Sequence, residues 1–164
     1  MWDTLLLALD EFDSGRRALD FTGQLARATR ARVRVLHVRE ILIGGKVPAL
    51  ESGTDAQLLV DQAVLRLHLE GVEADGLVCT RRDRQIPRRI VEESVDAGCG
   101  AIVLGSRRLR GLHRVASHHV REEVIRLSRL PVITAPPPAE WSGHRSGPGD
   151  GSSVSGHAWP DLGW

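Results

Sequence analysis

The stretch Ala101-Ile-Val-Leu-Gly-Ser-Arg-Arg-Leu-Arg-Gly-Leu-His-Arg114 is the most informative part of the sequence. Its apolar run stops at Gly105 and is followed by a cluster of arginines that begins with Arg107. A second apolar run, 5–9, ends at Asp10. Short continuous apolar runs are typical of parallel strands that are covered on both faces. Because ligands bind beyond the carboxyl ends of such strands, we expect a crevice with Asp10 on one side and Gly105 with Arg107 on the other.

Short apolar runs alternate with helical patterns along the chain. The runs that predict strands are 4–9, 33–38, 72–80, 101–104 and 132–135. Alternation of strand and helix predicts parallel strands joined by right-handed crossovers. The expected fold class is therefore α/β, with an open five-stranded parallel sheet and helices on both faces, of the Rossmann-like kind.

Two of the predicted helices carry specific local signals. The segment 54–57, Thr-Asp-Ala-Gln, resembles a capping box, and the apolar residues expected to carry the helix that follows are Leu58, Val64, Leu65 and Leu69. Pro87 suits the first turn of the next helix. The face of that helix predicted to be buried consists of Ile90, Val91, Ser94 and Val95. The pairs Arg88–Glu92 and Arg89–Glu93 have i,i+4 spacing and are interpreted as ordinary surface ion pairs.

Length and composition fit one domain, predicted at residues 1–136, followed by a disordered tail rich in Gly, Ser and Pro at 137–164. The tail contains Trp141, Trp159 and Trp164, for which docking onto a groove or a partner is the alternative to simple disorder. A net charge of +1 and an aromatic content of 4% argue against nucleic-acid binding.

The same composition bears on the cellular compartment. The chain contains no apolar run of 18 residues, so no membrane span is expected, and its start lacks the pattern of a signal peptide. Cys79 and Cys99 lie in apolar contexts without a CxxC motif, which predicts reduced, buried thiols. A cytoplasmic protein is therefore expected.

Several short motifs, in the same order along the chain, resemble the universal stress protein family. They are Leu5-Leu-Leu-Ala-Leu-Asp10 with the helix that follows, Val35-Leu-His-Val38, Ala101-Ile-Val-Leu-Gly-Ser-Arg107 and Leu130-Pro-Val-Ile133. The resemblance implies an adenine-nucleotide α-hydrolase-like fold, a stress-response function and a homodimer that pairs through Val132–Ala135. It also implies that Asp10 lies on the adenine side of a nucleotide site and that Val38 contacts the base. From the residues alone, Asp10 either orients a bound base or caps the helix that follows.

The family's ATP-binding members carry a glycine, two residues, a second glycine, nine residues, and then glycine followed by serine or threonine. Gly105 matches the first position, but Arg108 stands at the second and His118 and His119 at the third and fourth. Glycines allow the backbone to approach phosphates, and a long side chain at these positions obstructs that approach. The sequence therefore resembles the branch without an intact ATP motif, a non-enzymatic regulatory protein that has no cofactor and acts on a protein partner.

The clustered arginines leave an alternative function open, the binding of a nucleotide or another phosphorylated ligand. The groups that follow the third and fourth predicted strands are Arg81, Arg82 and Arg84, and Arg107, Arg108 and Arg110. Guanidinium groups bind phosphate in bidentate fashion, so an arginine-lined crevice could hold ATP, another adenine nucleotide or another phosphorylated ligand in a different pose. Protonation of His118 or His119 would then tune anion affinity near neutral pH. The alternative is that both are simply exposed residues at the start of the final helix. The spacing of His113, His118 and His119 does not indicate a metal site.

Overall fold

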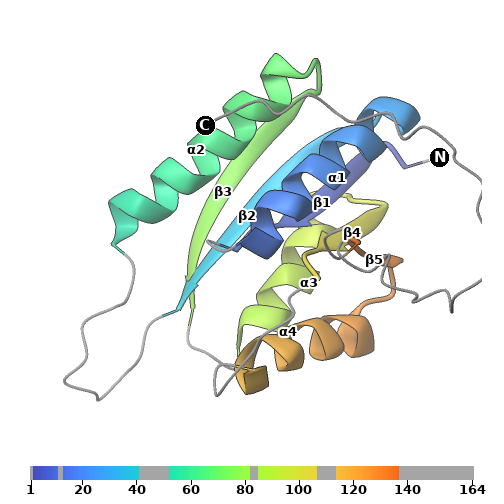
Figure 1. Ribbon diagram of the computed structural model, residues 1–164. Coiled ribbons are helices and arrows are strands. Elements are labelled where there is room, and N and C mark those ends of the chain that lie inside the picture. Colours follow the sequence, from blue (N-terminus) through green and yellow to red (C-terminus); the bar gives the residue numbers. More distant parts are fainter. Residues whose placement is uncertain (1, 11–12, 41–51, 82–84, 107–113, 137–164) are drawn as a thin grey trace, which may run out of the picture.

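Strands and helices alternate along the whole of the computed structural model, which describes residues 2–10, 13–40, 52–81, 85–106 and 114–136 (Figure 1). The strands are β1 (Thr4–Ala8), β2 (Arg32–Glu40), β3 (Ala74–Arg81), β4 (Ala101–Leu104) and β5 (Val132–Thr134). The helices are α1 (Asp13–Thr29), α2 (Gly53–Leu69), α3 (Ile86–Asp96) and α4 (Arg114–Leu127).

The five strands form one parallel sheet in the order β3-β2-β1-β4-β5. The chain first adds strands on one side of β1 and then crosses to the other side, so that β1 and β4 are neighbours. Their register pairs Leu5 with Ala101 and Ala8 with Leu104. The predicted fold class is confirmed, and the reversal of strand order lies between the two strands expected to flank the crevice.

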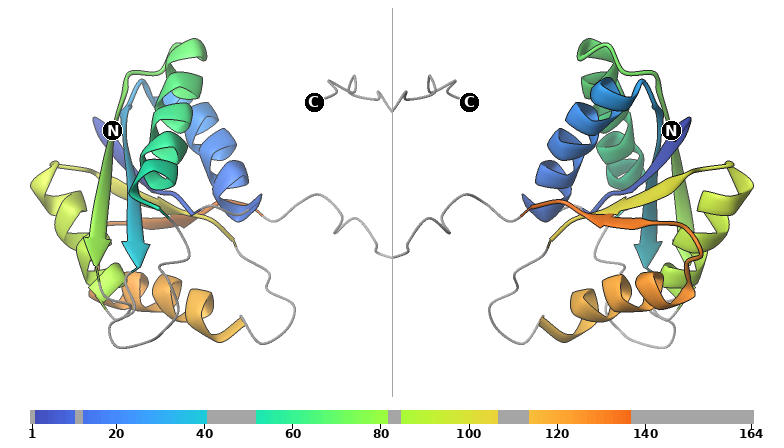
Figure 2. Two further views of the ribbon diagram at one scale, coloured as in Figure 1. Left: turned by 90° about the vertical axis from the view of Figure 1, so that its left-hand side faces the viewer. Right: turned by 90° about the vertical axis from the view of Figure 1, so that its right-hand side faces the viewer.

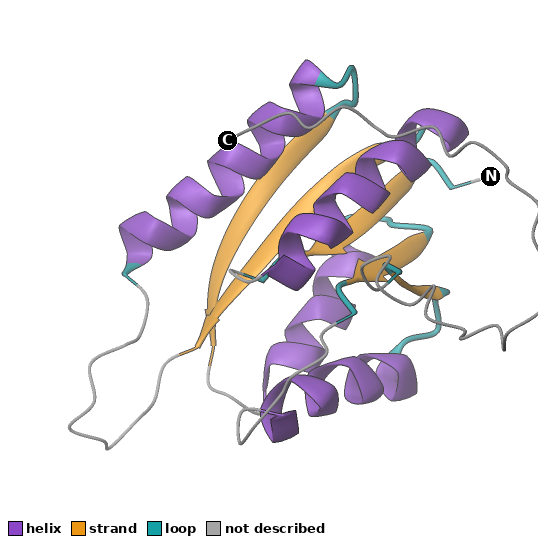
Figure 3. Cartoon of the chain, in the orientation of Figure 1, coloured by secondary structure: helices purple, strands orange, loops and turns teal. Residues whose placement is uncertain are grey.

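Helices cover both faces of the sheet (Figures 2 and 3). The helices α1 and α2 pack on one face, in a cluster that includes Leu5 and Leu7 of β1. The helices α3 and α4 pack on the other face, in a cluster that includes Leu6. Because successive side chains of a strand point to opposite faces, an unbroken leucine run can serve both clusters, and Leu5, Leu6 and Leu7 are all 0% exposed.

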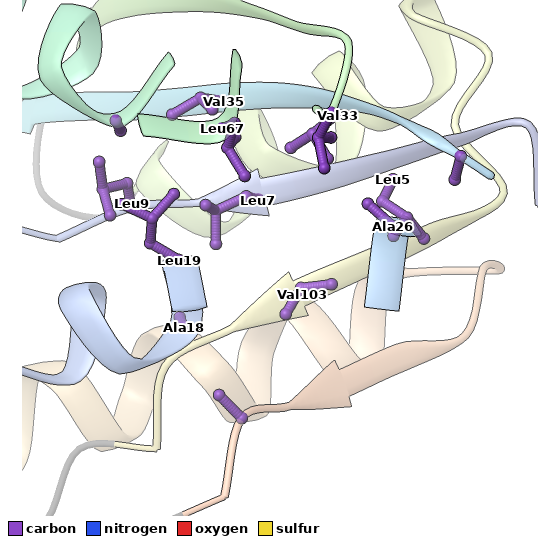
Figure 4. Close-up of a cluster of buried hydrophobic side chains, with 14 of the residues drawn as sticks. Leu5, Leu7, Leu9, Ala18, Leu19, Ala26, Val33, Val35, Leu67 and Val103 are labelled. Carbon is purple, nitrogen blue, oxygen red and sulfur yellow. The ribbon is translucent and has the colours of Figure 1, made fainter. Parts of the chain in front are cut away.

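Figure 4 shows the first cluster, in which side chains from β1, β2, β4, α1 and α2 meet. Close packing here depends on a glycine in the edge strand β3. A Cβ on Gly76 would lie 2.2 Å from Cγ1 of Val60 on α2, so only glycine permits this separation of helix and strand. The glycine is therefore required by the close contact between β3 and α2.

The predicted face of α2 is largely wrong. Val64 does pack against the first cluster, but Leu58, Leu65 and Leu69 are exposed. The residues that the helix buries are Ala56, Val60, Ala63 and Leu67. This second set also recurs at helical spacing, and its two alanines, together with Gly76, let α2 lie close to the sheet.

The start of α2 also differs from the prediction. The N-cap is Ser52, two residues before Thr54, and its Oγ accepts a hydrogen bond of 3.0 Å from the backbone N–H of Asp55. Ser52 Oγ also donates to the Asp55 carboxylate at 2.7 Å. A hydroxyl residue followed three positions later by an acid or an amide occurs here in two overlapping frames, Ser52–Asp55 and Thr54–Gln57, and the structure uses the earlier one.

In α3 the prediction is partly confirmed. Pro87 occupies the first turn, Ile90 and Ser94 are buried, and Val91 packs against the second cluster. Val95, in contrast, is 66% exposed. The buried face instead includes a carboxylate.

That carboxylate belongs to Glu93, which is 3% exposed. It lies between Arg89, one turn earlier on α3, and Arg34 of β2, whose Nε is 3.1 Å from Glu93 Oε1. Arg88–Glu92 is the expected surface pair, whereas Arg89–Glu93 is a largely buried pair within α3. The Arg34–Glu93 pair joins this helix to the sheet. The opposite charges on two sides make burial of this acid tolerable.

The remaining features concern the cysteines, the membrane and the tail. Cys79 and Cys99 are both free; Cys99 is buried, whereas Cys79 is only half-buried. In the described part of the chain, no helix is both long and apolar enough to cross a membrane. The predicted tail, 137–164, lies outside the described residues.

Candidate functional site

The candidate site lies at the carboxyl edge of the sheet, where β1 and β4 end side by side. Asp10 follows β1, and Gly105 and Ser106 follow β4. The helix α1 begins at the same edge, with Asp13 as its first residue. The structure thus brings together Asp10, Gly105 and a helix N-terminus, whose amides and dipole favour negative charge.

The carboxylate of Asp10 accepts hydrogen bonds from the first turn of α1. It accepts hydrogen bonds from Ser14 Oγ, at 2.7 and 3.0 Å from its two oxygens, and from the backbone N–H of Gly15 at 2.8 Å. An acid that accepts an amide of the first helical turn satisfies a donor with no partner inside the helix. Of the two roles expected for Asp10, capping of α1 is therefore the one that the structure supports.

Gly15 and Gly105 are both required by the close approach of main chains. A Cβ on Gly15 would lie 2.1 Å from the carbonyl oxygen of Asp10. A Cβ on Gly105 would lie 2.8 Å from the carbonyl oxygen of Ser14 and 3.0 Å from its carbonyl carbon. Any larger residue at Gly105 would therefore push the end of β4 away from the first turn of α1.

The hydroxyl of Ser106 is the unexplained polar group of the site. Its oxygen is buried and, within the residues that the structure describes, has no hydrogen-bond partner. A buried hydroxyl loses its bonds to water, so an unpaired one is uncommon in a native protein. The sequence analysis quoted this serine within a motif but assigned it no role.

His37 is a second residue that sequence analysis missed. It is 6% exposed, and its Nδ1 lies 2.8 Å from the carbonyl oxygen of Leu9. Since a carbonyl only accepts, the proton is on Nδ1, and the ring fastens the end of β1 to β2. A histidine between apolar strand residues is the one signal that could have suggested this role.

Val38 does not join this group. Its side chain packs half-buried in the cluster on the α3–α4 face, with Leu36 and Leu77. A cavity of about 210 Å³ beside Asp10 lies on the opposite side, between α1 and α2. Its lining residues are Leu9, Asp10, Arg16, Leu19, Leu59, Gln62, Ala63 and Arg66.

A slightly larger hollow, about 240 Å³, lies at the amino ends of β1, β2 and β3. Its charges are already matched, because Arg32 pairs with Glu73 at 3.0 Å and Arg34 with Asp75 at 2.7 Å. The carboxyl edge is therefore the better candidate, in keeping with the usual position of ligands in open α/β sheets.

Comparison with known proteins identifies the family. The sequence profile of the universal stress protein family matches residues 1–136. The chain belongs to the universal stress protein family. A curated relative, the universal stress protein YxiE of Bacillus subtilis (strain 168), is 26% identical over 148 residues, which cover 81% of this chain and 98% of the relative.

Solved universal stress proteins have the same fold. One from Burkholderia pseudomallei superposes with a TM-score of 0.65 at 22% identity, over 82% of this chain and 96% of that one. One from Archaeoglobus fulgidus, in complex with dAMP, superposes with a TM-score of 0.59 at 25% identity, over 80% of this chain and 94% of that one. The resemblance seen in the sequence motifs is confirmed.

In this universal stress protein the later positions of the glycine motif fall inside a helix. The helix α4 begins at Arg114, so His118 is its fifth residue and His119 its sixth. The prediction that these histidines begin the helix is wrong by about one turn. Only the first few amides of a helix are free to bind an anion, and the amides of His118 and His119 lie beyond them. The side chain of His119 is exposed.

The arginine groups are only partly within the described residues. Arg107, Arg108 and Arg110 lie outside them, as do Arg82 and Arg84. Arg81 is exposed at the end of β3 and donates to the carbonyl oxygen of Thr80 at 2.8 Å. It shares the carboxyl edge with Gly105, but β2 and β1 lie between their strands. Within the part of the chain that is described, no group of three metal-ligating side chains occurs.

Proposed function

We propose that this universal stress protein is a non-enzymatic, cytoplasmic regulatory protein whose crevice does not hold ATP in the pose implied by the family's glycine motif. The observation that carries the proposal is the position of α4. Because the helix begins at Arg114, the amides at His118 and His119 are committed to hydrogen bonds within it. A triphosphate would lack the free amides that a glycine-rich turn supplies at a helix N-terminus.

Side-chain bulk also disfavours the binding of ATP in this pose. Arg108 and His118 replace two glycines of the motif, and each adds a side chain where the main chain would have to approach phosphate closely. The remaining glycine, Gly105, is explained by packing, since a Cβ would lie 2.8 Å from the Ser14 carbonyl oxygen. Its presence is therefore no argument for a phosphate site.

Thermal unfolding with and without ATP tests the proposal. A ligand that binds only the folded state raises the melting temperature, by an amount that grows with its concentration over Kd. We expect no shift for the natural chain at ATP concentrations on the order of 1 mM, where a site with a micromolar Kd would add about 4 kcal/mol. The triple variant Arg108→Gly/His118→Gly/His119→Ser restores the motif and should gain a shift. Arg110→Gly, a change outside the motif, is the matched control.

A second candidate function is the binding of a smaller phosphorylated ligand in another pose. The hydroxyl of Ser106, which has no partner among the described residues, and the cavity of about 210 Å³ beside Asp10 support it. The structure of the Archaeoglobus fulgidus relative is a complex with dAMP. Melting curves with AMP, dAMP and inorganic phosphate distinguish the two functions. A shift that is lost in Ser106→Ala, but kept in the control Thr54→Ala, an exposed residue that does not line the cavity, would favour this second function.

We also propose that the protein is a homodimer that pairs through Val132–Ala135. In the single chain β5 is an edge strand, with Val132 and Ile133 half-buried and Thr134 exposed. An uncovered edge invites pairing with another strand. Sedimentation should give twice the chain mass, and both Ile133→Pro and Thr134→Arg should reduce it. The second variant leaves the buried side chains intact, so an unchanged mass in a folded Thr134→Arg protein would rule this interface out.

A further inference from the structure

The outer side of α2 carries an apolar stripe that the described part of the chain leaves uncovered. Its members are Leu58, Leu65 and Leu69, which are 54%, 58% and 80% exposed. At 100° per residue their side chains fall within about 40° of one another around the helix, opposite the side that faces the sheet. We call these residues the α2 leucine stripe. Apolar side chains that line up on one exposed side of a helix are a candidate contact surface.

The chain contains an apolar segment whose spacing matches this stripe. Three of the four tryptophans lie beyond residue 136, and the segment Trp159-Pro-Asp-Leu-Gly-Trp164 holds two of them together with Leu162. Pro160 has a fixed φ and disfavours helical backbone at the residue before it, so the sequence favours an extended segment of the polyproline II kind. Its apolar residues occur at intervals of three and two.

The spacing of the three leucines along α2 agrees with the spacing of the three apolar residues along the segment 159–164. On a helix that rises 1.5 Å per residue, Leu58 and Leu65 are about 10.5 Å apart along the axis, and Leu65 and Leu69 about 6 Å. In polyproline II geometry, with three residues per turn and about 3.1 Å per residue, Trp159 and Leu162 fall on the same side of the segment, about 9 Å apart. Gly163 leaves the backbone free to bring Trp164 to that side, about 6 Å further along. One register therefore sets Trp159 against Leu58, Leu162 against Leu65 and Trp164 against Leu69.

We propose that the α2 leucine stripe is a docking surface for residues 159–164 of the same chain. The connection is long enough, because the 23 residues from Pro136 to Trp159 extend to about 75 Å and have a root-mean-square span of about 25 Å when flexible. A folded domain of this size has a radius of gyration of about 14 Å, so the stripe is within reach. Tethering also supplies a millimolar local concentration, which favours this occupant over a second copy at micromolar concentration.

Disulfide trapping in the full-length chain tests the proposal. In a Cys79→Ser/Cys99→Ala background, Leu65→Cys is combined with Leu162→Cys, the partner that the register assigns to it. The matched control combines Gln57→Cys with Leu162→Cys, since Gln57 is exposed on the same helix but about 100° away from the stripe. Oxidation at low micromolar protein, followed by non-reducing electrophoresis and peptide mapping, separates bonds within one chain from bonds between chains.

We expect the Leu65→Cys pair to close within one chain at least about tenfold faster than the Gln57→Cys pair, a modest advantage for a tethered docking segment. Trp159→Ala/Trp164→Ala in the same background should abolish this difference without unfolding the domain. Equal rates for the two pairs would mean random collision and would overturn the proposal. Covalent dimers as the main product of the Leu65→Cys pair would also overturn it, because the stripe would then belong to an interface between copies.

Discussion

Glu93 and Glu92 provide a comparison of two neighbouring acids with identical spacing and different burial. Each is the i+4 partner of an arginine on α3, but Glu93 is 3% exposed and the side chain of Glu92 is 45% exposed. Replacement of each by glutamine removes the charge and keeps the shape. We predict that Glu93→Gln destabilises the protein strongly and that Glu92→Gln does so barely.

The magnitude follows from the partners left behind. Removal of one member of a buried ion pair typically costs 3–5 kcal/mol, because the other charge stays buried without compensation. Here Arg34 keeps Asp75 at 2.7 Å, and Arg89 keeps Asp96 at 3.5 Å. The two arginines therefore lose only part of their compensation, and we expect roughly 2–3 kcal/mol for Glu93→Gln. An exposed pair such as Arg88–Glu92 is worth about 0–1 kcal/mol.

Equilibrium unfolding in urea, followed by far-ultraviolet circular dichroism, measures both free energies. With a slope of about 1–3 kcal/mol per molar urea, Glu93→Gln should lower the midpoint by about 1–2 M. The slope itself should stay unchanged. Losses within about 0.5 kcal/mol of one another for the two variants would refute the assignment of Glu93 to a buried network.

Three further predictions concern packing, pH and capping. Gly105→Ala should lower stability by about 1–3 kcal/mol in thermal unfolding, since its Cβ would lie 2.8 Å from the Ser14 carbonyl oxygen; an unchanged melting temperature would mean that the strand end and α1 move apart freely. Burial raises the pKa of the Cys99 thiol from 9.0 to about 11. The unfolded chain therefore loses this proton first, and stability should fall by about 1–3 kcal/mol between pH 9 and pH 11; in Cys99→Ala this part of the loss should disappear. Ser52→Ala should lower the free energy of unfolding by about 0.5–2 kcal/mol because it removes the cap of α2. Thr54→Ala should lower it by less than about 0.5 kcal/mol. A larger loss for Thr54→Ala than for Ser52→Ala would mean that the helix is capped at Thr54, as the sequence predicts.

Patterns within one element were enough to predict the sheet. The run 101–104 is bounded by glycines and is buried at every position, so its limits coincide with those of β4. The strand pair β1–β4 and the carboxyl edge then follow from the rules of α/β topology. Gly105 and Asp10 follow these two strands and therefore lie at the carboxyl edge that the sequence predicts.

Features that depend on a second element could not be predicted in this way. Two apolar stripes run along α2, and the choice between them depends on Gly76 of β3. Arg88–Glu92 and Arg89–Glu93 look alike in the sequence, and Arg34, 59 residues away from Glu93, distinguishes them.

The same limit applies to the candidate site. The contact of His37 with Leu9 joins residues 28 positions apart. Nothing beside Ser106 in the sequence shows that its hydroxyl is buried and lacks a partner among the described residues. Both features arise from the meeting of strand ends, which single-element patterns do not describe.

The most direct test of the central claim is a crystal of the unmodified protein soaked with ATP. The claim is that Arg108, His118 and the early start of α4 leave no bare main chain for a triphosphate. The account predicts no ordered triphosphate against residues 105–108 and the amides of His118 and His119. Fully occupied density for the three phosphates at these positions, with α4 shortened to expose the amides, would contradict it.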